Sequence, residues 1–206
     1  MPPLGGKKRV HNWNVRAMKI QPQKAILLLG LLCLVACKPA PTSQAGPDNV
    51  QPTGLPSAMP ADFQVSYAWE VGSLPPAHFY RYTINLGLAE AGQIEFQAGY
   101  AGEDAAVWVE RFEIVEAELE SLYTEIYAAG VFEQRLEQME DIPMGGSADK
   151  LQVIAYGVAY QVPSYVAGEA NEKALDAIYA KIENLVPPNV WDKLNAQHAE
   201  YVEAHE

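Results

Sequence analysis

The chain has 206 residues, with 26 acidic and 14 basic side chains, a formal net charge of −12 and only two cysteines. This negative balance disfavours nucleic acid and anionic lipid headgroups as partners, and it suits a solvated surface or a basic partner. Both cysteines, Cys33 and Cys37, stand near the N-terminus. The rest of the chain therefore has no thiol for a disulfide, a Cys-ligated metal or a cysteine nucleophile.

The first 36 residues have the three-part order of a secretory signal peptide. A basic segment without acidic residues comes first, an apolar run from residue 25 to residue 36 follows, and Cys37 stands next. The apolar run is too short for a membrane-spanning helix, which needs about 20 apolar residues. We therefore predict that residues 1–36 are a cleaved leader, with Met18 as an alternative start that gives a more ordinary leader length.

The four residues Leu34-Val35-Ala36-Cys37 resemble the lipobox of bacterial lipoproteins. The resemblance implies that Cys37 becomes the N-terminal residue and carries acyl chains such as palmitate, and two or more chains anchor a protein stably. Lys38 follows in place of Asp, which by the same resemblance implies an outer-membrane anchor facing the periplasm. An ordinary cleaved signal peptide or a short buried helix is the alternative.

Residues 37–60 are predicted to be the lipidated cysteine and a disordered tether. Six prolines alternate with small and polar residues, and almost no apolar side chain is available for a core. As a coil this segment would span about 25–30 Å and hold the domain off the bilayer. Residues 61–206 are predicted to form one acidic domain. All 26 acidic residues but only eight basic ones follow Cys37, so the mature chain would carry a charge near −18.

The first part of this domain has the period-two pattern of strands with one wet face. Apolar and polar residues alternate, with Glu110 as an exception, through residues 63–70, 80–88, 93–98 and 107–114. A more apolar segment, 151–156, continues through Gly157 into 159–162 as a predicted hairpin. Residues 131–139 fit either a short strand or irregular chain.

Apolar residues at three- and four-residue spacing predict three helices. The first contains Leu119–Tyr127 and stops at Gly130, and the second has its apolar stripe in Leu175–Leu185. Pro187-Pro188 ends the second helix, and Asn189 is predicted to cap the third. We therefore predict an α+β fold, an antiparallel sheet of five or six strands with about three helices packed on one face.

No catalytic, cofactor-binding or metal-binding residue is predicted, and no cofactor is expected. The chain lacks the Gly-x-Ser-x-Gly and His-Glu-x-x-His patterns and the glycine patterns of nucleotide-binding loops. His198 and His205 could share a helix face as a metal pair. Solvated histidines near a frayed C-terminus are the favoured interpretation.

Three further clusters are interpreted as solvated or structural groups. The acidic segment 137–141 could offer oxygen ligands to calcium but lacks the EF-hand pattern. Glu116 and Glu120 could act as an acid–base pair on a sugar, but we expect them to face solvent on a helix. Gly145-Gly146-Ser147 could form an anion-binding nest, and a tight turn is favoured because no helix start with basic residues follows.

Aromatic side chains are the other candidates for a binding surface. If Trp69, Trp108, Tyr80 or Tyr82 lined a sheet face that no helix covers, that face could stack on sugars or hold a partner. Core packing is favoured, because most of these residues fall in the apolar register.

Short motifs in the second half are Asp141-Ile142-Pro143, Gly145-Gly146-Ser147 and Leu185-Val186-Pro187 with Trp191-Asp192-Lys193-Leu194. In these motifs the domain resembles a group of uncharacterised bacterial proteins, and this resemblance implies no activity.

The function we predict is that of a membrane-anchored, non-catalytic envelope domain that binds an envelope protein or glycan and no nucleic acid. An envelope hydrolase acting on glycan or peptide is one alternative, and a structural accessory subunit of an outer-membrane assembly is the other. A contiguous exposed apolar or aromatic patch would favour an interaction function. A concave pocket with two facing carboxylates, one with a raised pKa, would favour an enzyme.

Overall fold

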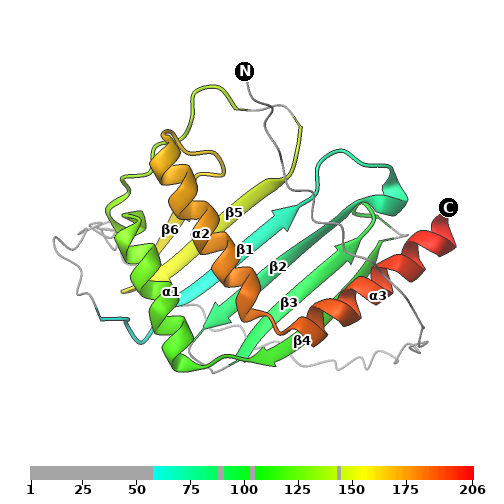
Figure 1. Cartoon of the computed structure of the whole chain (residues 1–206), viewed down its shortest axis with the longest axis horizontal. Helices are drawn as coiled ribbons and strands as arrows, with labels where there is room; N and C mark the ends of the chain where they lie inside the picture. The colour runs from blue at the N-terminus through cyan, green and yellow to red at the C-terminus, as the bar shows by residue number, and fades with distance from the viewer. Residues whose placement is uncertain (1–57, 88–90, 103–104, 143–144) are drawn as a thin grey trace, which may run out of the picture. The chain divides into compact units, whose positions relative to one another are not determined.

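The computed structural model describes residues 58–87, 91–102, 105–142 and 145–206, so the leader, Cys37 and the tether up to residue 57 lie outside the described residues. The described chain forms one six-stranded antiparallel sheet and three α-helices (Figure 1). The predicted α+β fold, with an antiparallel sheet of five or six strands, is confirmed.

The six strands form the sheet in the order β4-β3-β2-β1-β5-β6. They are β1 (Gln64–Glu70), β2 (Tyr80–Gly87), β3 (Ala91–Ala98), β4 (Ala106–Glu113), β5 (Ala148–Ala155) and β6 (Val158–Val162). The first four strands form an antiparallel meander, and the β5–β6 hairpin pairs with the other edge of β1. Strand β1 is therefore interior, and Trp69 lies opposite both Tyr82 of β2 and Asp149 of β5.

All three α-helices lie over the same face of the sheet, as predicted (Figure 1). The helices are α1 (Glu116–Ala128), α2 (Glu169–Leu185) and α3 (Pro188–His205), with two 3₁₀ turns, η1 (Pro76–His78) and η2 (Val131–Glu133). Helices α1 and α2 pack together, and the Lys181 ammonium of α2 pairs with the Glu125 carboxylate of α1. Helix α3 contacts η1, β3 and β4. Among the described helices, none combines the length and apolar character that a membrane crossing requires.

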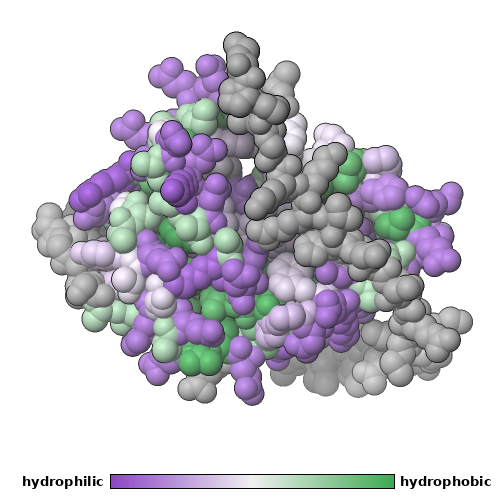
Figure 2. Space-filling model, in the orientation of Figure 1, coloured by the Kyte–Doolittle hydropathy of each residue, from purple (hydrophilic) through white to green (hydrophobic). Residues whose placement is uncertain are grey.

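The core lies between this sheet face and the helices, and alternate strand positions and helix stripes supply it, as their periods predict. The largest fully buried side chains are Phe63, Tyr67, Ile84, Ile94, Phe96, Leu122, Tyr123, Ile126, Leu151, Ile178, Ile182 and Leu194. Seen from outside, the helix-bearing side is mostly hydrophilic, and apolar residues form small separate patches on it (Figure 2).

The opposite face of the sheet carries the polar positions of the strands. Glu95 is exposed there, and the side chains of Val107 and Val109 on β4 are 52% and 49% exposed. Glu110 breaks the alternation of β4 because its carboxylate pairs with the Lys193 ammonium of α3 on the helix side. An ion pair thus explains the one charged residue in an inward position of β4.

The β5–β6 hairpin turns at Tyr156-Gly157, as predicted for Gly157. Both residues have positive φ, 55° and 73°, which is typical of a two-residue hairpin turn. The Asp62 carboxylate accepts hydrogen bonds from the backbone N–H groups of Tyr156 at 2.9 Å and Gly157 at 2.5 Å. The bond from Gly157 is the main cause that lowers the pKa of Asp62.

Two local predictions need comment. The prediction that Asn189 caps the third helix is wrong, because α3 begins at Pro188 and Pro187 occupies the N-cap position. Proline suits the first helical turn, where its fixed φ fits and its missing N–H would have no partner. Segment 131–139, which fitted either a strand or irregular chain, forms η2 and a single antiparallel bridge from Gln138 to Val166.

Candidate functional site

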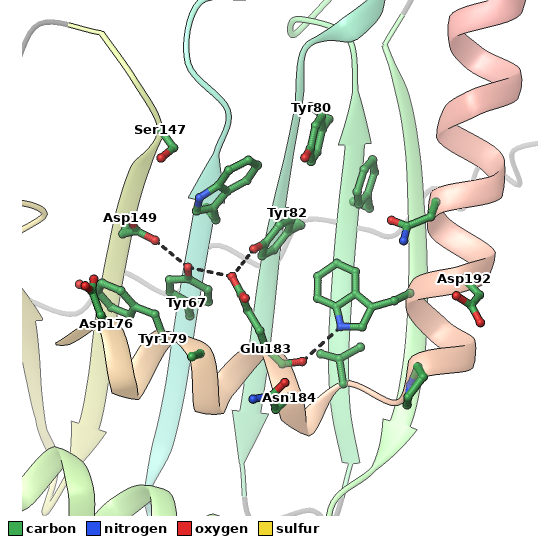
Figure 3. Close-up of a pocket in the computed structure, with 17 residues that line it drawn as sticks. Tyr67, Tyr80, Tyr82, Ser147, Asp149, Asp176, Tyr179, Glu183, Asn184 and Asp192 are labelled. Carbon is green, nitrogen blue, oxygen red and sulfur yellow. Dashed lines mark hydrogen bonds between the residues drawn. The ribbon is translucent and has the colours of Figure 1, made fainter. Parts of the chain in front are cut away.

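A large pocket lies between α2 and α3 over β1, β2 and the start of β5 (Figure 3). The two helices diverge from Pro187-Pro188, so the sheet beneath them is not closed over by helix packing (Figure 1). The pocket has a volume of about 920 Å³, within the range of small-molecule sites. Aromatic and acidic side chains supply most of its wall, which includes Tyr67, Trp69, Tyr80, Tyr82, Asp149, Asp176, Tyr179, Glu183, Trp191 and Asp192.

Stacked aromatic rings from β1 and β2 form one side of the pocket. The rings of Trp69 and Tyr82, which are register partners, stack at 5.4 Å with 17° between their planes. Tyr80 lies 5.3 Å from Trp69, and Trp191 of α3 meets Tyr82 edge-on at 5.1 Å. The Trp191 indole N–H also donates to the backbone carbonyl of Glu183 at 3.2 Å. Such fixed ring faces can hold apolar or cationic groups.

A row of carboxylates and phenols crosses the floor of the pocket (Figure 3). The Tyr67 hydroxyl donates to Oδ1 of Asp149 at 2.6 Å and lies 3.4 Å from Oε1 of Glu183. The Tyr82 hydroxyl donates to the same Glu183 oxygen at 2.6 Å. A phenol has only one proton to donate. Tyr67 therefore donates it to Asp149, which lies closer to the hydroxyl than Glu183 does.

Burial and neighbouring charge disfavour the ionised forms in this row. Burial raises the pKa of Asp149, the negative charges of Glu183 and Asp176 raise it further, and the hydrogen bond from Tyr67 opposes this shift. Burial, followed by nearby phenol and carboxylate groups, raises the pKa of both Tyr67 and Tyr82. The phenols therefore remain hydrogen-bond donors at neutral pH, while the carboxyl group of Asp149 loses its proton less readily than that of an exposed aspartic acid.

Tyr179 of α2 closes the row from the helix side. Its ring stacks on Tyr67 at 5.0 Å with 16° between the planes, and its side chain is 8% exposed. Within the described part of the chain, the buried Tyr179 hydroxyl has no hydrogen-bond partner. Leaving a buried polar group unsatisfied costs about 1–3 kcal/mol. A ligand with a complementary polar group could remove that cost.

Three of the four candidate aromatic residues line the pocket, and the fourth, Trp108, does not. Trp69, Tyr80 and Tyr82 lie on the helix-covered side of the sheet, so they form no aromatic surface on its open face. The favoured core packing is confirmed for Tyr82, which is 7% exposed, whereas Trp69 and Tyr80 remain partly exposed in the pocket. Trp108 packs beside Phe96 at 5.8 Å and is not among the pocket residues.

The prediction that His198 is solvated is wrong. Its side chain is 9% exposed and packs beside the rings of Tyr80, at 4.9 Å, and Phe96, at 5.6 Å. The reason is that α3 remains helical as far as His205 and lies on the sheet. Burial, with a smaller contribution from His78, lowers the pKa of His198 to about 4. His205 is exposed, as predicted.

The remaining candidates lie at the surface. Glu116 and Glu120 are exposed on α1, and residues 137–141 are exposed, as predicted for solvated charges. Gly145-Gly146, with φ of 83° and 94°, forms an exposed turn, and the following Ser147 lines the pocket. Among the described residues, no three His, Cys, Asp or Glu side chains gather as a metal-binding group. The lipidation site predicted at Cys37 lies outside the described residues.

The two carboxylates on the floor of the pocket, Asp149 and Glu183, were not among the candidate residues from the sequence, although each leaves a local signal. Asp149 occupies the inward register of β5, where Leu151 and Val153 follow on the same face and are buried. Glu183 stands four residues after Tyr179 and next to the buried Ile182. A charged residue that extends an apolar register or borders an apolar stripe is an informative exception.

No family model matches this chain, and no curated protein has a significantly similar sequence. The lipobox resemblance and the resemblance of the domain to a group of bacterial proteins therefore stay predictions.

Proposed function

We propose that this chain is a lipid-anchored bacterial envelope protein whose domain binds a small ligand in the pocket between α2 and α3, without converting it. The observation that carries the proposal is the convergence of fixed aromatic faces and partly buried carboxylates on one pocket of about 920 Å³. A pocket with an apolar wall and a few directed polar groups is typical of ligand sites.

The proposed location depends on the N-terminal residues. The lipobox resemblance of Leu34-Val35-Ala36-Cys37 supports acylation at Cys37, and Lys38 supports an outer-membrane position facing the periplasm. The tether would let the domain present its pocket away from the bilayer. A glycan fragment, a peptide or another envelope metabolite fits this location, and an envelope protein could deliver or receive it.

Filling the pocket should abolish ligand binding without unfolding the domain. Ala180 lines the pocket from α2, so the Ala180→Trp side chain would occupy space that a ligand needs. In a thermal-shift screen of small envelope fragments, we expect at least one compound to raise the Tm of the wild-type chain by about 5 °C at saturating concentration. The same compound should leave the Tm of Ala180→Trp unchanged.

Ala177→Trp is the matched control, because Ala177 is exposed on the same helix and does not line the pocket. This variant should respond to the compound like the wild type. If every compound that stabilises the wild type stabilises Ala180→Trp equally, the pocket is not the binding site and the proposal fails.

A hydrolase acting on glycan or peptide is the second candidate function. The specific observation in its favour is that Asp149, a carboxyl with a raised pKa, and Glu183 lie on the two sides of the Tyr67 hydroxyl. Acid catalysts often have such a shifted pKa beside a second carboxylate. The Tyr67 side chain, only 1% exposed, lies where a scissile bond would have to enter between the carboxylates, so binding is the better supported function.

The hydrolase hypothesis predicts that Asp149→Asn lowers the turnover of an envelope glycan or peptide by about 100-fold or more. Product release is measured by chromatography, and Asp141→Asn, which changes an exposed carboxylate, is the control. Wild-type chain that releases no product, or Asp149→Asn chain that keeps full turnover, would exclude Asp149 as a catalytic acid.

A further inference from the structure

The charge of the pocket restricts the chemistry of its ligand. Four carboxylates, those of Asp149, Asp176, Glu183 and Asp192, line it, and no lysine or arginine stands among the described residues of its wall. A ligand carrying a carboxylate or phosphate would meet only negative charge there, and like charges in a partly desolvated site repel strongly. The wall therefore selects against anions.

The hydrogen bonds on the pocket floor come from neutral donors. Two phenol protons, from Tyr67 and Tyr82, are shared between Asp149 and Glu183, and neither donor carries a positive charge. Burial raises the pKa of Asp149, and the negative charges of Glu183 and Asp176 raise it further. A cation bound on the pocket side of these groups would offset that repulsion.

The aromatic side of the pocket is suited to the same kind of group. The stacked rings of Trp69 and Tyr82 stand beside the Glu183 carboxylate to which Tyr82 donates. Ring faces attract ammonium groups through their quadrupole, and tryptophan is the best of them. A ring face also accepts the hydrocarbon part of a ligand.

Tyr179 provides an independent indication of a polar ligand group. Its side chain is more than nine-tenths buried and lines the pocket, and its hydroxyl has no hydrogen-bond partner within the described part of the chain. The Asp149 and Asp176 charges lie near enough to raise the pKa of this hydroxyl further, after burial. Tyr179 lies at the same end of the pocket as Asp149 and Asp176 (Figure 3), so an N–H donor that approaches these carboxylates would come close to Tyr179 as well.

We propose that the pocket binds a small organic amine, with its ammonium group on the pocket side of Asp149 and Glu183, beside Tyr179, and its hydrocarbon part against Trp69 and Tyr82. This inference rests on the proposed binding function and names the ligand class. The carboxylates bind the ammonium through charge-assisted hydrogen bonds, the Tyr179 hydroxyl accepts an N–H, and the rings hold the carbon skeleton.

The test compares two probes of equal size, 2-phenylethylammonium and the neutral 2-phenylethanol. Binding to the full chain, purified in a neutral detergent, is followed by tryptophan fluorescence, because Trp69 and Trp191 line the pocket. We expect the ammonium probe to bind at least about tenfold more tightly than the alcohol, and this preference to fall as salt is raised. Equal affinity of the two probes would overturn the proposal.

Three variants test which carboxylates are responsible for the preference for the ammonium probe. Glu183→Gln keeps an oxygen that can accept the Tyr82 hydrogen bond and removes the charge, so it should weaken binding of the ammonium probe about tenfold and leave the alcohol unaffected. Asp176→Asn, exposed on α2, is a second charge removal that does not disturb the core, and it should weaken the ammonium probe about threefold. Glu95→Gln, on the opposite face of the sheet, should change nothing.

The outcomes separate this inference from the proposed function. If a neutral or anionic envelope fragment binds in a way that Ala180→Trp abolishes, while the ammonium probe shows no preference, the binding function stands and the amine assignment is wrong. Ammonium binding that persists unchanged in both Glu183→Gln and Asp176→Asn would also reject the assignment, because the charge of the pocket would then play no part.

Discussion

In cells that produce the Cys37→Ser chain, we expect the protein to leave the membrane fraction and to appear in the soluble fraction. Serine offers no thiol for acylation, and each methylene of a lost acyl chain removes about 0.8 kcal/mol of membrane affinity. Two chains anchor a protein stably, so their loss should shift nearly all of the material. Fractionation with mass spectrometry of the N-terminal peptide measures partition and acylation together.

Cys33→Ser is the matched control for this experiment, because Cys33 lies in the apolar run of the leader, which is predicted to be removed by cleavage. That variant should stay in the membrane fraction with an acylated Cys37. Cys37→Ser protein that remains in the membrane fraction after a high-salt wash would contradict the lipid anchor, since high salt removes proteins held by charge alone.

The strands of the sheet were predictable because one of its faces is buried and the other is not. In β2, Tyr82, Ile84 and Leu86 are buried while Arg81 and Asn85, at alternate positions, are exposed, and this contrast is the period-two pattern in the sequence. The boundaries of the helices were predicted less accurately than the strands. Proline both ends α2 and begins α3, so the capping preference that pointed to Asn189 was overridden.

The pocket could not be predicted, because its walls have the same residue pattern as a core. Trp69 and Tyr82 occupy inward positions in either case, and only the divergence of α2 and α3 decides whether rings there meet a helix or open space. That divergence depends on the direction of α3 after Pro187-Pro188, which is a tertiary property. Asp149 was the available signal, since a carboxylate in an inward register requires partners that a purely apolar core cannot supply.

His198 illustrates the opposite error, in which a polar residue near the chain end is buried. The near-terminal position predicts fraying, but α3 packs on the sheet as far as Tyr201, which is 9% exposed. Packing of its amphipathic face stabilises the helix more than fraying at the chain end destabilises it. The buried imidazole that results makes the stability of the domain sensitive to acid.

Acidification from pH 7 to pH 4 should remove about 3 kcal/mol of the unfolding free energy through His198 alone. Burial lowers its pKa from 6.5 to about 4 in the folded domain. Between those values the unfolded chain takes up a proton and the folded chain does not, so protons favour unfolding in this window. The contribution is fully present above pH 6.5 and is lost as the pH falls towards 4.

The measurement is urea unfolding at a series of pH values, with His198→Leu compared to the parent chain. Leucine keeps apolar contact with Tyr80 and Phe96 but cannot take up a proton, so its stability should fall by about 3 kcal/mol less than that of the parent over this range. His205→Leu, which alters an exposed histidine of the same helix, should keep the parental pH dependence.

The raised pKa of Asp149 acts in the opposite direction, because the folded domain holds a proton on Asp149 more readily than the unfolded chain does. This effect is common to all three chains and cancels in their differences. Parallel curves for the parent and His198→Leu would mean that His198 takes up its proton in the folded domain as readily as in the unfolded chain.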